Sequence, residues 1–509
     1  MAKTIEELSK VLDIEVPQSG KLDITGLAYN SKEVQSGDAF FCIPGEKFDG
    51  NKFVGDAIKA GALLIVSEKD KPEDFDKEYP DYKGAYFKVD CVREAMGRLA
   101  SFYFDYPSSK LRLLGVTGTN GKTTTTHIIE HVLNESGHKT ALIGTMGVRW
   151  PGKSDFVDTH HTTPQSIDLQ KLLAQMVKDS VTHAAMEVSS HAIFLKRVEG
   201  CQFASASLTN LTQDHLDFHK TMDHYRHSKL GLWDLLSLSK AKNKSSVINK
   251  DDSSAVYFTQ ATPESARLFT YGFKESDFQV KSAKYSGTGT KIVLKTPESN
   301  EDTELVLPLL GEFNVYNVLC ALAICYAEGV SVSQFQKALN TFESVPGRFQ
   351  LVGLSLENKN TPICIVDYAH TPDGLEKILK AARPMVEDGK KLFVVFGCGG
   401  DRDPTKRPKM AEVAASLADE LIITSDNPRS EDPDKIIEDI LVGIDQSKKE
   451  LVAVEADRRT AIHETIARAQ AHDMVVVAGK GHETYQILKD RTIDFNDAEE
   501  IKIALKKRL

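Results

Sequence analysis

Long apolar runs are absent from this sequence. No stretch approaches the roughly 18 consecutive apolar residues that a membrane-spanning helix needs. The residues at 1–16 mix acidic and apolar side chains in the manner of an amphipathic helix, without the pattern of a secretory leader. We therefore expect a cytoplasmic protein without a membrane span.

Cysteine is also scarce, and the chain has no net positive charge. The seven cysteines are scattered, odd in number and never spaced as Cys-x-x-Cys. They fit neither a disulfide framework nor a zinc site, and they are typical of a reducing compartment. The formal net charge is −10 at pH 7. A surface of that sign does not neutralise a phosphate backbone, so we expect no nucleic-acid partner.

Internal repeats and low-complexity segments are lacking as well, while 41% of the 509 residues are hydrophobic. That length and composition are typical of about three globular domains with full cores. We predict an α/β protein with a small N-terminal α/β domain at 1–109, a central domain at 110–345 and a C-terminal Rossmann-like domain at 346–509. We expect a monomer.

Short apolar runs alternate with helical patterns along the whole chain. In the first domain the runs at 38–44 and 63–68 flank a helical pattern at 53–62. Alternation of this kind favours mostly parallel sheets with helices on both faces. The segment from about Pro263 to Glu304 is polar, and we expect a small antiparallel excursion there. Further strands are predicted at 111–118, 141–148, 182–188, 205–210, 245–250, 362–369, 391–397, 420–426 and 473–479.

A glycine-rich turn joins the first predicted strand of the central domain to a helix. Glycines let the backbone approach a phosphate, and the helix N-terminus adds partial positive charge. Lys122 would then reach the β- and γ-phosphates, and the Thr123 hydroxyl would bind Mg²⁺. The usual first glycine of such a loop is replaced by Val116. The lysine favours ATP over a dinucleotide. The ATP-binding residues predicted here are Gly118, Thr119, Asn120, Gly121, Lys122, Thr123 and Thr124.

Two polar clusters, at 186–191 and 209–217, follow apolar strands of the same predicted sheet. Ligands bind at the carboxyl edge of such sheets, and carboxylate and hydroxyl oxygens suit Mg²⁺. The loop GTNGKTT and these clusters resemble motifs of the Mur ligase family, over essentially the whole chain. Members of this family phosphorylate a carboxylate and let an amine displace the phosphate.

The resemblance implies a catalytic set made of Lys122, Glu187, His215 and Lys229. Thr123 and Glu187 would bind Mg²⁺ beside ATP, and His215 would help to hold a second Mg²⁺. Lys229 matches the family lysine that reacts with CO₂ to give a carbamate, N6-carboxylysine, which is also a metal ligand. An ammonium at 4 Å from Mg²⁺ would be repelled by about 4 kcal/mol per unit-charge pair at an effective dielectric of 20, whereas a carbamate is attracted.

Four further residues match nucleotide-contacting positions of the family. Asn314 and Asn317 open a long apolar helix and would face the adenine side of ATP. Arg348 lies where the central domain meets the C-terminal domain, and Asp367 ends a strand of the latter. The resemblance implies that closure of the C-terminal domain would complete the ATP site and exclude water from it.

The N-terminal motifs resemble those with which the tripeptide-forming members bind a UDP-linked muramoyl dipeptide. The segments at 30–32 and 45–50 belong to this pattern. One departure is Leu195, where we expect Gln, so that one contact is lost or replaced. The residues implied to contact the precursor are Ser31, Thr162, Thr163, Ser189 and Arg197.

The C-terminal motifs match the pattern associated with meso-2,6-diaminopimelate. This diamino acid carries a second amine-and-carboxylate head that L-lysine lacks. The forked guanidinium of Arg429 would bind that carboxylate, and Glu483 would accept from the ammonium. The residues implied to bind the amino acid are Arg402, Asp426, Asn427, Pro428, Arg429, Gly479 and Glu483.

The implied reaction is the ATP-dependent addition of diaminopimelate to UDP-N-acetylmuramoyl-L-alanyl-D-glutamate, in peptidoglycan precursor synthesis. The same reaction with L-lysine stays open, as does a folate-type glutamate ligase. An inactive nucleotide-binding scaffold is disfavoured because Lys122, Glu187, His215 and Lys229 are all present.

Overall fold

A computed structural model describes residues 2–45, 49–157, 159, 161–286, 289–353 and 361–508. The middle of the segment predicted at 45–50 therefore lies outside the described residues. The chain divides into two compact units. Unit 1 comprises Met1–Gln279 and Leu319–Ala338, and unit 2 comprises Val280–Val318 and Leu339–Leu509.

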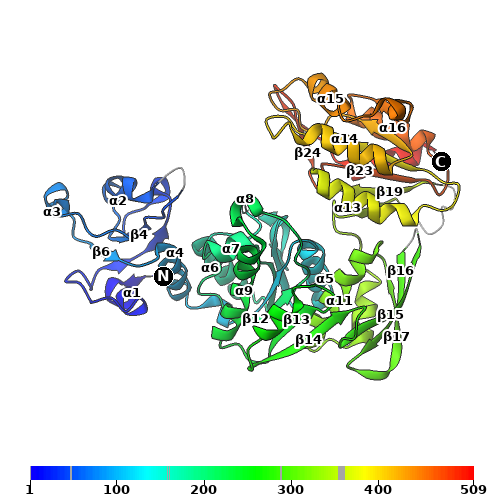
Figure 1. The fold of residues 1–509 in the computed structure, drawn as a ribbon. Coiled ribbons are helices and arrows are strands. Elements are labelled where there is room, and N and C mark those ends of the chain that lie inside the picture. Colours follow the sequence, from blue (N-terminus) through cyan, green and yellow to red (C-terminus); the bar gives the residue numbers. More distant parts are fainter. Residues whose placement is uncertain are drawn as a thin grey trace. The chain divides into compact units, whose positions relative to one another are not determined.

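The N-terminal part of unit 1 is a parallel sheet covered by helices, drawn in blue in Figure 1. Its strands lie in the order β3 (Gly26–Ala28), β4 (Asp38–Phe41), β5 (Leu64–Ser67) and β6 (Ala85–Lys88). The remaining elements are β1 (Lys3–Thr4), α1 (Ile5–Val11), β2 (Asp23–Ile24), α2 (Val54–Lys59), α3 (Phe75–Glu78) and α4 (Val92–Tyr103). The predicted strands and the helix between them are confirmed, although α1 ends well before residue 16.

The central sheet of unit 1 is mostly parallel. Its strand order is β10 (Lys153–Val157), β9 (Gly147–Trp150), β8 (Thr140–Gly144), β11 (His183–Glu187), β7 (Arg112–Thr117), β12 (Phe203–Leu208), β13 (Lys244–Asn249) and β14 (Ala266–Gly272). Only the β8–β9–β10 meander at one edge is antiparallel among the described strands of this list. The carboxyl ends of β7, β11 and β12 lie together at one edge of the sheet, which is where the polar clusters begin.

Helices cover this sheet and bury its apolar side chains. Leu173 of α6, Trp233 of α9 and Phe203 of β12 belong to one buried cluster, while the apolar side chains of α5, such as Ile129, are also fully buried. The helices of the region are α5 (Lys122–Glu135), α6 (Ser166–Lys178), α7 (Ser190–Phe194), α8 (Leu216–His219), α9 (Met222–Leu238), α10 (Ala255–Gln260), α11 (Glu312–Ala327) and α12 (Val332–Leu339).

The segment after Pro263 differs in part from the expectation of an antiparallel excursion. That expectation is wrong for β14, which pairs in parallel with β13 along its whole length. The reason is that α10 connects the two strands as a crossover, and a crossover returns the chain in the same direction. The antiparallel pairing starts later, between β16 (Gly289–Thr296) and β17 (Ser299–Leu307), after β15 (Phe278–Ser286).

The C-terminal part of unit 2 is a sheet between two layers of helices (Figure 1). Its strand order is β18 (Gln350–Val352), β19 (Ile363–Asp367), β23 (Met474–Ala478), β20 (Leu392–Phe396), β21 (Glu420–Ile423) and β22 (Val452–Val454), with only β18 antiparallel among them. A small hairpin, β24 (Tyr485–Ile487) with β25 (Thr492–Asp494), follows β23.

Two apolar clusters lie on opposite sides of this sheet. One cluster contains side chains of α13 (Pro372–Ala382), α14 (Lys406–Leu417) and α15 (Pro433–Leu441), and the other contains side chains of α16 (Arg458–Arg468) and α17 (Asp497–Arg508). The predicted fold class, α/β with mostly parallel sheets, is confirmed. No helix in the described part of the chain combines the length and apolar character of a membrane span.

Candidate active site

The phosphate loop lies between β7 and α5, as predicted. Gly118 has a φ of +146°, and a Cβ built there would lie 1.9 Å from Oγ1 of Thr209. Gly121 has a φ of +86° and precedes the first residue of α5. Both positions therefore require glycine, because side chains are strained in this backbone region.

The loop is held in place by the segment that follows β12. The backbone N–H of Thr119 donates to the carbonyl of Asn210 at 2.8 Å, and that of Asn120 donates to Oδ1 of Asn210 at 3.0 Å. Oγ1 of Thr209 donates to the carbonyl of Asn120 at 2.6 Å. Lys122 Nζ lies over the same turn, where it donates to the carbonyls of Gly118 and Thr119 at 2.9 Å each.

Glu187 gathers oxygen atoms at the end of β11. Its side chain is only 1% exposed. Oε2 accepts from the hydroxyl of Thr123 at 3.0 Å and from that of Thr145 at 3.1 Å, while Oε1 accepts from the Thr145 N–H at 2.9 Å. Two of the predicted magnesium ligands, Thr123 and Glu187, thus meet beside the phosphate loop. A carboxylate and a hydroxyl at this spacing suit the oxygen preference of Mg²⁺.

Lys229 is buried within α9 and 1% exposed. Its Nζ donates to the carbonyl of Gly118 at 2.8 Å and lies 4.5 Å from the centre of the Tyr225 ring. Burial, followed by the charge of Lys122, lowers the pKa of Lys229 well below its usual value, against a smaller opposing effect of Asp214. An amine with a lowered pKa is a better nucleophile at neutral pH, so the surroundings of Lys229 fit reaction with CO₂.

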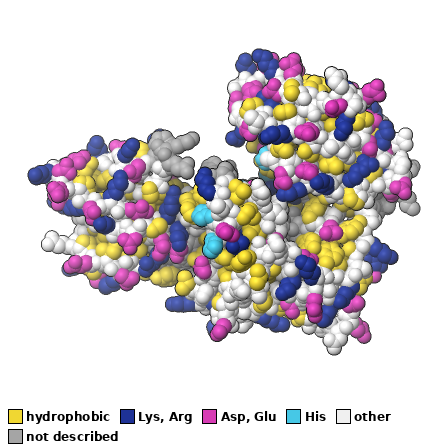
Figure 2. Space-filling view, viewed as in Figure 1, with side chains coloured by type: hydrophobic (Ala, Val, Ile, Leu, Met, Phe, Trp, Pro, Cys, Tyr) yellow, Lys and Arg dark blue, Asp and Glu magenta, His cyan; other side chains and the backbone are white. Residues whose placement is uncertain are grey.

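His215 is more exposed than the other predicted catalytic residues. It precedes α8 with a φ of +53°, and its Nε2 lies 3.6 Å from Oδ2 of Asp214. Its ring centre lies 4.9 Å from that of His191 and 6.2 Å from that of Tyr225. Histidine side chains are visible at the surface near α7 and α8 (Figure 2). Histidine, cysteine, aspartate and glutamate do not form a group of three or more that could hold a metal ion among the described residues.

Two of the residues predicted to contact the UDP precursor, Ser189 and Arg197, bond to a third, Thr163. The Thr163 hydroxyl donates to the carbonyl of Glu187 at 2.9 Å, and the Ser189 N–H donates to the same hydroxyl at 3.3 Å. Arg197 NH1 donates to the carbonyl of Thr163 at 3.2 Å. Thr162 lies next in the chain, with its hydroxyl 3.2 Å from that of Thr145.

The same region retains one unsatisfied donor. Nε of Arg197 is buried and has no hydrogen-bond partner among the described residues, and burial lowers the pKa of this guanidinium. Leu195, which replaces the expected Gln, is half-buried at the C-terminal end of α7. Ser31 opens a short 3₁₀ turn (Ser31–Glu33) in the N-terminal part of unit 1.

The nucleotide-contacting residues predicted in unit 2 form two local groups. Asn317 Nδ2 donates to Oδ1 of Asn314 at 2.9 Å, and both amides are buried in the first turns of α11. Asp367 accepts from the backbone N–H groups of Phe349 and Ala369 at 2.7 and 2.8 Å, although burial raises its pKa. The guanidinium of Arg348 lies 5.3 Å from the Tyr368 ring centre, next to these contacts.

Most of the residues predicted to bind the amino acid lie on two loops, after β21 and after β23, while Arg402 lies on the loop between β20 and α14. Asn427 Nδ2 donates to Oε2 of Glu483 at 2.8 Å, which joins the loops. Arg429 has a φ of +52°, and its NH1 donates to the carbonyl of Gly400 at 2.8 Å. A Cβ at Gly479 would lie 2.9 Å from Oδ2 of Asp426, so these two residues are in close contact.

The remaining predicted residues of this group frame the two loops. Pro428 is buried between Asn427 and Arg429, and the side chain of Arg402 is exposed. A residue without an assigned role, Lys480, lies at the centre of the group and is fully buried. Lys480 Nζ donates to Oε2 of Glu483 at 2.9 Å and to Oδ1 of Asn427 at 3.1 Å. Its place in Gly-Lys-Gly-His-Glu is a signal in the sequence that could have pointed to it.

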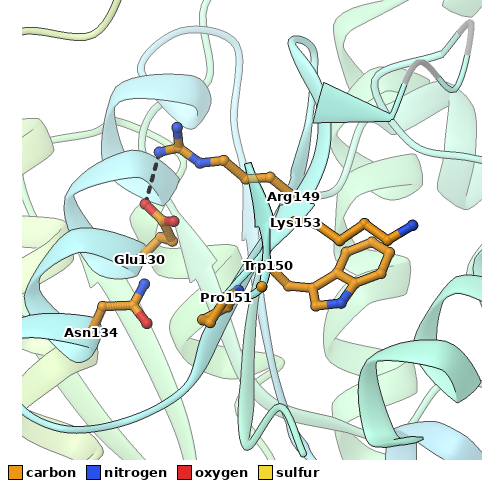
Figure 3. Close-up of a pocket in the computed structure, with 7 residues that line it drawn as sticks. Glu130, Asn134, Arg149, Trp150, Pro151 and Lys153 are labelled. Carbon is orange, nitrogen blue, oxygen red and sulfur yellow. Dashed lines mark hydrogen bonds and ion pairs between the residues drawn. The ribbon is translucent and has the colours of Figure 1, made fainter. Parts of the chain in front are cut away.

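A surface cavity of about 530 Å³ lies elsewhere in unit 1, between α5 and the β9–β10 hairpin (Figure 3). Glu130 and Arg149 form an ion pair of 2.9 Å at its rim. Glu130 lies eight residues along α5 from Lys122, which corresponds to about 12 Å. The residues that line it are Glu130, Asn134, Arg149, Trp150, Pro151, Gly152 and Lys153. None of the predicted site residues is among them.

Family models match most of the chain. They are the Mur ligase family catalytic domain at residues 23–104, the Mur ligase middle domain at 116–325 and the Mur ligase glutamate ligase domain at 347–481. A protein of Thermosynechococcus vestitus is 44% identical over 489 residues, which cover 96% of this chain and 94% of that protein. It is named UDP-N-acetylmuramoyl-L-alanyl-D-glutamate–2,6-diaminopimelate ligase.

This chain belongs to the Mur ligase family. The resemblance inferred from the motifs is confirmed, and so is the expected enzyme class, because the members of this family are ligases.

Solved structures of Mur ligases share the fold. A UDP-N-acetylmuramoyl-L-alanyl-D-glutamate–2,6-diaminopimelate ligase structure is 31% identical, has a TM-score of 0.73 and covers 100% of this chain and 99% of its own. The MurF ligase of Thermotoga maritima in complex with ADP is 19% identical, with a TM-score of 0.58 over 96% of this chain and 99% of that one, and shows the fold alone.

Proposed function

We propose that this chain adds meso-2,6-diaminopimelate to UDP-N-acetylmuramoyl-L-alanyl-D-glutamate, with ATP as the phosphate donor, in peptidoglycan precursor synthesis. The observation that carries the proposal is full-length similarity, at 44% identity, to a ligase named for this reaction. A structure named for the same reaction, at a TM-score of 0.73, supports it.

ATP would bind at the phosphate loop of unit 1. Gly118 and Gly121 open the backbone there, and α5 directs its N-terminus to the same place. Mg²⁺, when bound, would neutralise charge on the phosphates. Thr123 and Glu187 would hold one such ion, and His215 with the carbamate of Lys229 would hold a second. The proposed nucleotide contacts in unit 2 are Asn314, Asn317, Arg348 and Asp367.

The reaction would proceed in two steps. An oxygen of the D-glutamate γ-carboxylate attacks the γ-phosphorus of ATP, ADP leaves, and an acyl phosphate forms. An amine of diaminopimelate then attacks the acyl carbon, loses a proton and expels phosphate. Lys122 would stabilise charge on the transferring phosphoryl group, in the way that positioning and electrostatics accelerate such transfers.

The carbamate at Lys229 would form before turnover. The neutral amine attacks the carbon of CO₂, a nitrogen–carbon bond forms, and the nitrogen loses a proton. The lowering of the Lys229 pKa by burial favours the neutral amine. The product would then place a negative charge beside the phosphate loop, where the neutral amine carried none.

The UDP-linked precursor would bind near Thr162, Thr163, Ser189 and Arg197, with Ser31 as a further contact. The buried Nε of Arg197 supports an anionic ligand there, because an unpaired buried donor is costly unless a ligand accepts from it. Leu195 would not contribute the hydrogen bond of the glutamine expected at its position.

The identity of the amine rests on Arg402, Arg429 and Glu483, on the loops of unit 2 that would bind it. Arg429 would bind the second carboxylate of diaminopimelate, and Glu483 its ammonium. Asp426, Asn427, Pro428 and Gly479 would complete the site. A site built to hydrogen-bond a group rejects an analogue that lacks it by about 10⁴–10⁵-fold, and L-lysine lacks that carboxylate.

We further propose three domains, at 1–109, 110–345 and 346–509, and a monomer in the cytoplasm. Each matched family segment lies inside one of these three ranges, which supports the division. Size-exclusion chromatography with light scattering would test the monomer.

A competition assay tests the proposed reaction directly. Purified protein receives ATP, Mg²⁺, the UDP-linked dipeptide and equal amounts of diaminopimelate and L-lysine, and the products are separated by mass. We expect the diaminopimelate product and ADP. Preferential addition of lysine would show that lysine, and not diaminopimelate, is the amino acid added. If the release of ADP does not depend on an added amino acid, the ligase reaction itself is contradicted.

A further inference from the structure

Arg458 is a fully buried arginine for which the proposed reaction gives no role. It is the first residue of α16 and is 1% exposed. Its Nε and NH2 donate to Oδ1 and Oδ2 of Asp497 at 2.8 Å each, and Asp497, the first residue of α17, is 0% exposed. This bidentate pair fixes the plane of the guanidinium.

The same guanidinium also holds two backbone carbonyls. NH1 donates to the carbonyl of Ser425 at 3.3 Å, and NH2 donates to that of Ala478 at 3.0 Å. Ser425 directly precedes Asp426, and Ala478 directly precedes Gly479. The two loops that carry most of the proposed amino-acid-binding residues therefore begin on carbonyls that one side chain holds.

The sheet fixes the spacing of the strand ends through β20, but its paired residues stop at Ile423 and Ala478, before the loops begin. They leave β21 and β23, which are not neighbours, because β20 lies between them in the strand order. No ladder hydrogen bond can join Ser425 to Ala478 across an intervening strand. Arg458 spans that gap at the base of the loops, whereas Lys480 and Asn427 join them further out.

We propose that Arg458, fixed by Asp497, is a positioning residue that sets the spacing of the two amino-acid-binding loops. The inference rests on the proposed function for the identity of the amino acid. The role of Arg458 in the spacing of the two loops rests on the geometry of unit 2 alone.

Energetics favour this role over simple stabilisation. A buried ion pair is often no more stabilising than apolar side chains of similar volume, because both charges lose their hydration. A guanidinium at this position provides what apolar side chains lack, namely donors for the two carbonyls. Lysine would not replace it, since one ammonium lacks the planar fork that reaches Asp497 and both carbonyls.

The test uses the full chain with three variants: Arg458→Lys, Arg458→Met, and Arg458→Met combined with Asp497→Leu. The double variant removes both charges, so that we expect its melting temperature to return toward that of the wild type. We expect all three to raise KM for diaminopimelate at least tenfold while KM for ATP stays within twofold. Ile466→Ala, on the same helix and in the same apolar cluster, serves as the control that lowers the melting temperature without a change in KM.

A second measurement does not depend on the substrate. We expect amide hydrogen exchange in the segments 426–430 and 479–486 to be faster in the double variant than in the wild type. If the double variant regains both its melting temperature and the KM of the wild type, or if exchange in the two segments is unchanged, the positioning role is overturned. A wild-type protein that adds no diaminopimelate contradicts the proposed function instead, and the exchange measurement still decides the inference.

Discussion

Thr123 donates its hydroxyl hydrogen bond to the carboxylate of Glu187 at 3.0 Å, which joins the first turn of α5 to the end of β11. The two residues are 64 positions apart in the chain, and each belongs to a different predicted motif. Their meeting beside the phosphate loop gives the proposed ATP-side ion two oxygen ligands and makes the site testable by single substitutions.

Glu187→Gln should abolish most turnover, because it keeps the shape of the side chain but removes its charge. Loss of a metal ligand removes several kcal/mol of transition-state stabilisation, so kcat should fall by at least about a hundredfold. Steady-state ADP release with a titration of Mg²⁺ measures this. Glu130→Gln, on α5 and at the cavity of Figure 3, is the matched control. If Glu187→Gln keeps the kcat of the wild type, Glu187 has no catalytic role.

Lys229→Arg should also inactivate the protein, because an arginine keeps a positive charge and forms no stable carbamate. The wild type supplied with ¹³C-bicarbonate should show a carbamate carbon resonance, and the variant should lack it. Lys240→Arg, at an exposed position beyond α9, is expected to retain both the resonance and the activity. An active Lys229→Arg enzyme would show that the carbamate is unnecessary.

Arg429→Ala should raise KM for diaminopimelate and leave the weak use of L-lysine unchanged. A hydrogen bond to a charged group contributes about 1.5–3 kcal/mol, which corresponds to roughly ten- to a hundredfold in KM. Competition kinetics with both amino acids measure the ratio. Arg459→Ala, a half-exposed arginine that pairs with Glu500, controls for loss of charge in the same unit. Equal changes for the two amino acids would remove Arg429 from the specificity site.

His219 should make the unfolding free energy depend on pH. Burial, followed by neighbouring histidines, lowers its pKa from 6.5 to about 4. Between these values the unfolded chain binds more protons than the folded one, so stability is complete above about pH 6.5 and is lost as the pH falls toward 4. Denaturation with chelator between pH 4 and 8 should show a contribution of His219 to this loss of up to about 3 kcal/mol, because one pKa unit corresponds to about 1.4 kcal/mol.

The matching variant is His219→Asn, which carries no titrating group at this position. Its unfolding free energy should depend less steeply on pH than that of the wild type over the same range. Identical slopes for the two proteins would mean that His219 does not keep a lowered pKa in the folded state.

Much of the fold could be predicted because short patterns of apolar and polar residues predict its individual helices and strands. The sequences of β4, β7, β11, β19 and β23 are mostly apolar, which is typical of parallel strands buried on both faces. The direction of β14 was not predicted, because the polar composition of the segment from about Pro263 to Glu304 as a whole suggested an antiparallel excursion. This strand is parallel only because α10 returns the chain across the sheet.

The placement of the candidate residues was predictable where a short motif follows an apolar strand, as in the glycine-rich loop after β7 and at Glu187 at the end of β11. The burial of Lys229 could not be predicted from the sequence of α9, where it follows two histidines and an arginine within a polar stretch. Arg458 was missed for a different reason. The partner of Arg458, Asp497, lies 39 residues away in the chain. The two groups that Arg458 also binds are backbone carbonyls, which every residue has, so the sequence does not mark them.

Lys480 places a buried cation inside the loops that would receive the amino acid. With Arg402 and Arg429 it gives three cations, while burial raises the pKa of Asp426, one of the three nearby carboxylates of Asp401, Asp426 and Glu483. Diaminopimelate carries two ammonium and two carboxylate groups and enters as a neutral molecule, whereas L-lysine carries one extra positive charge. Lysine would therefore be repelled as it approaches the site, in addition to lacking a hydrogen bond once it is bound. This electrostatic preference for diaminopimelate should weaken as salt screens the charges.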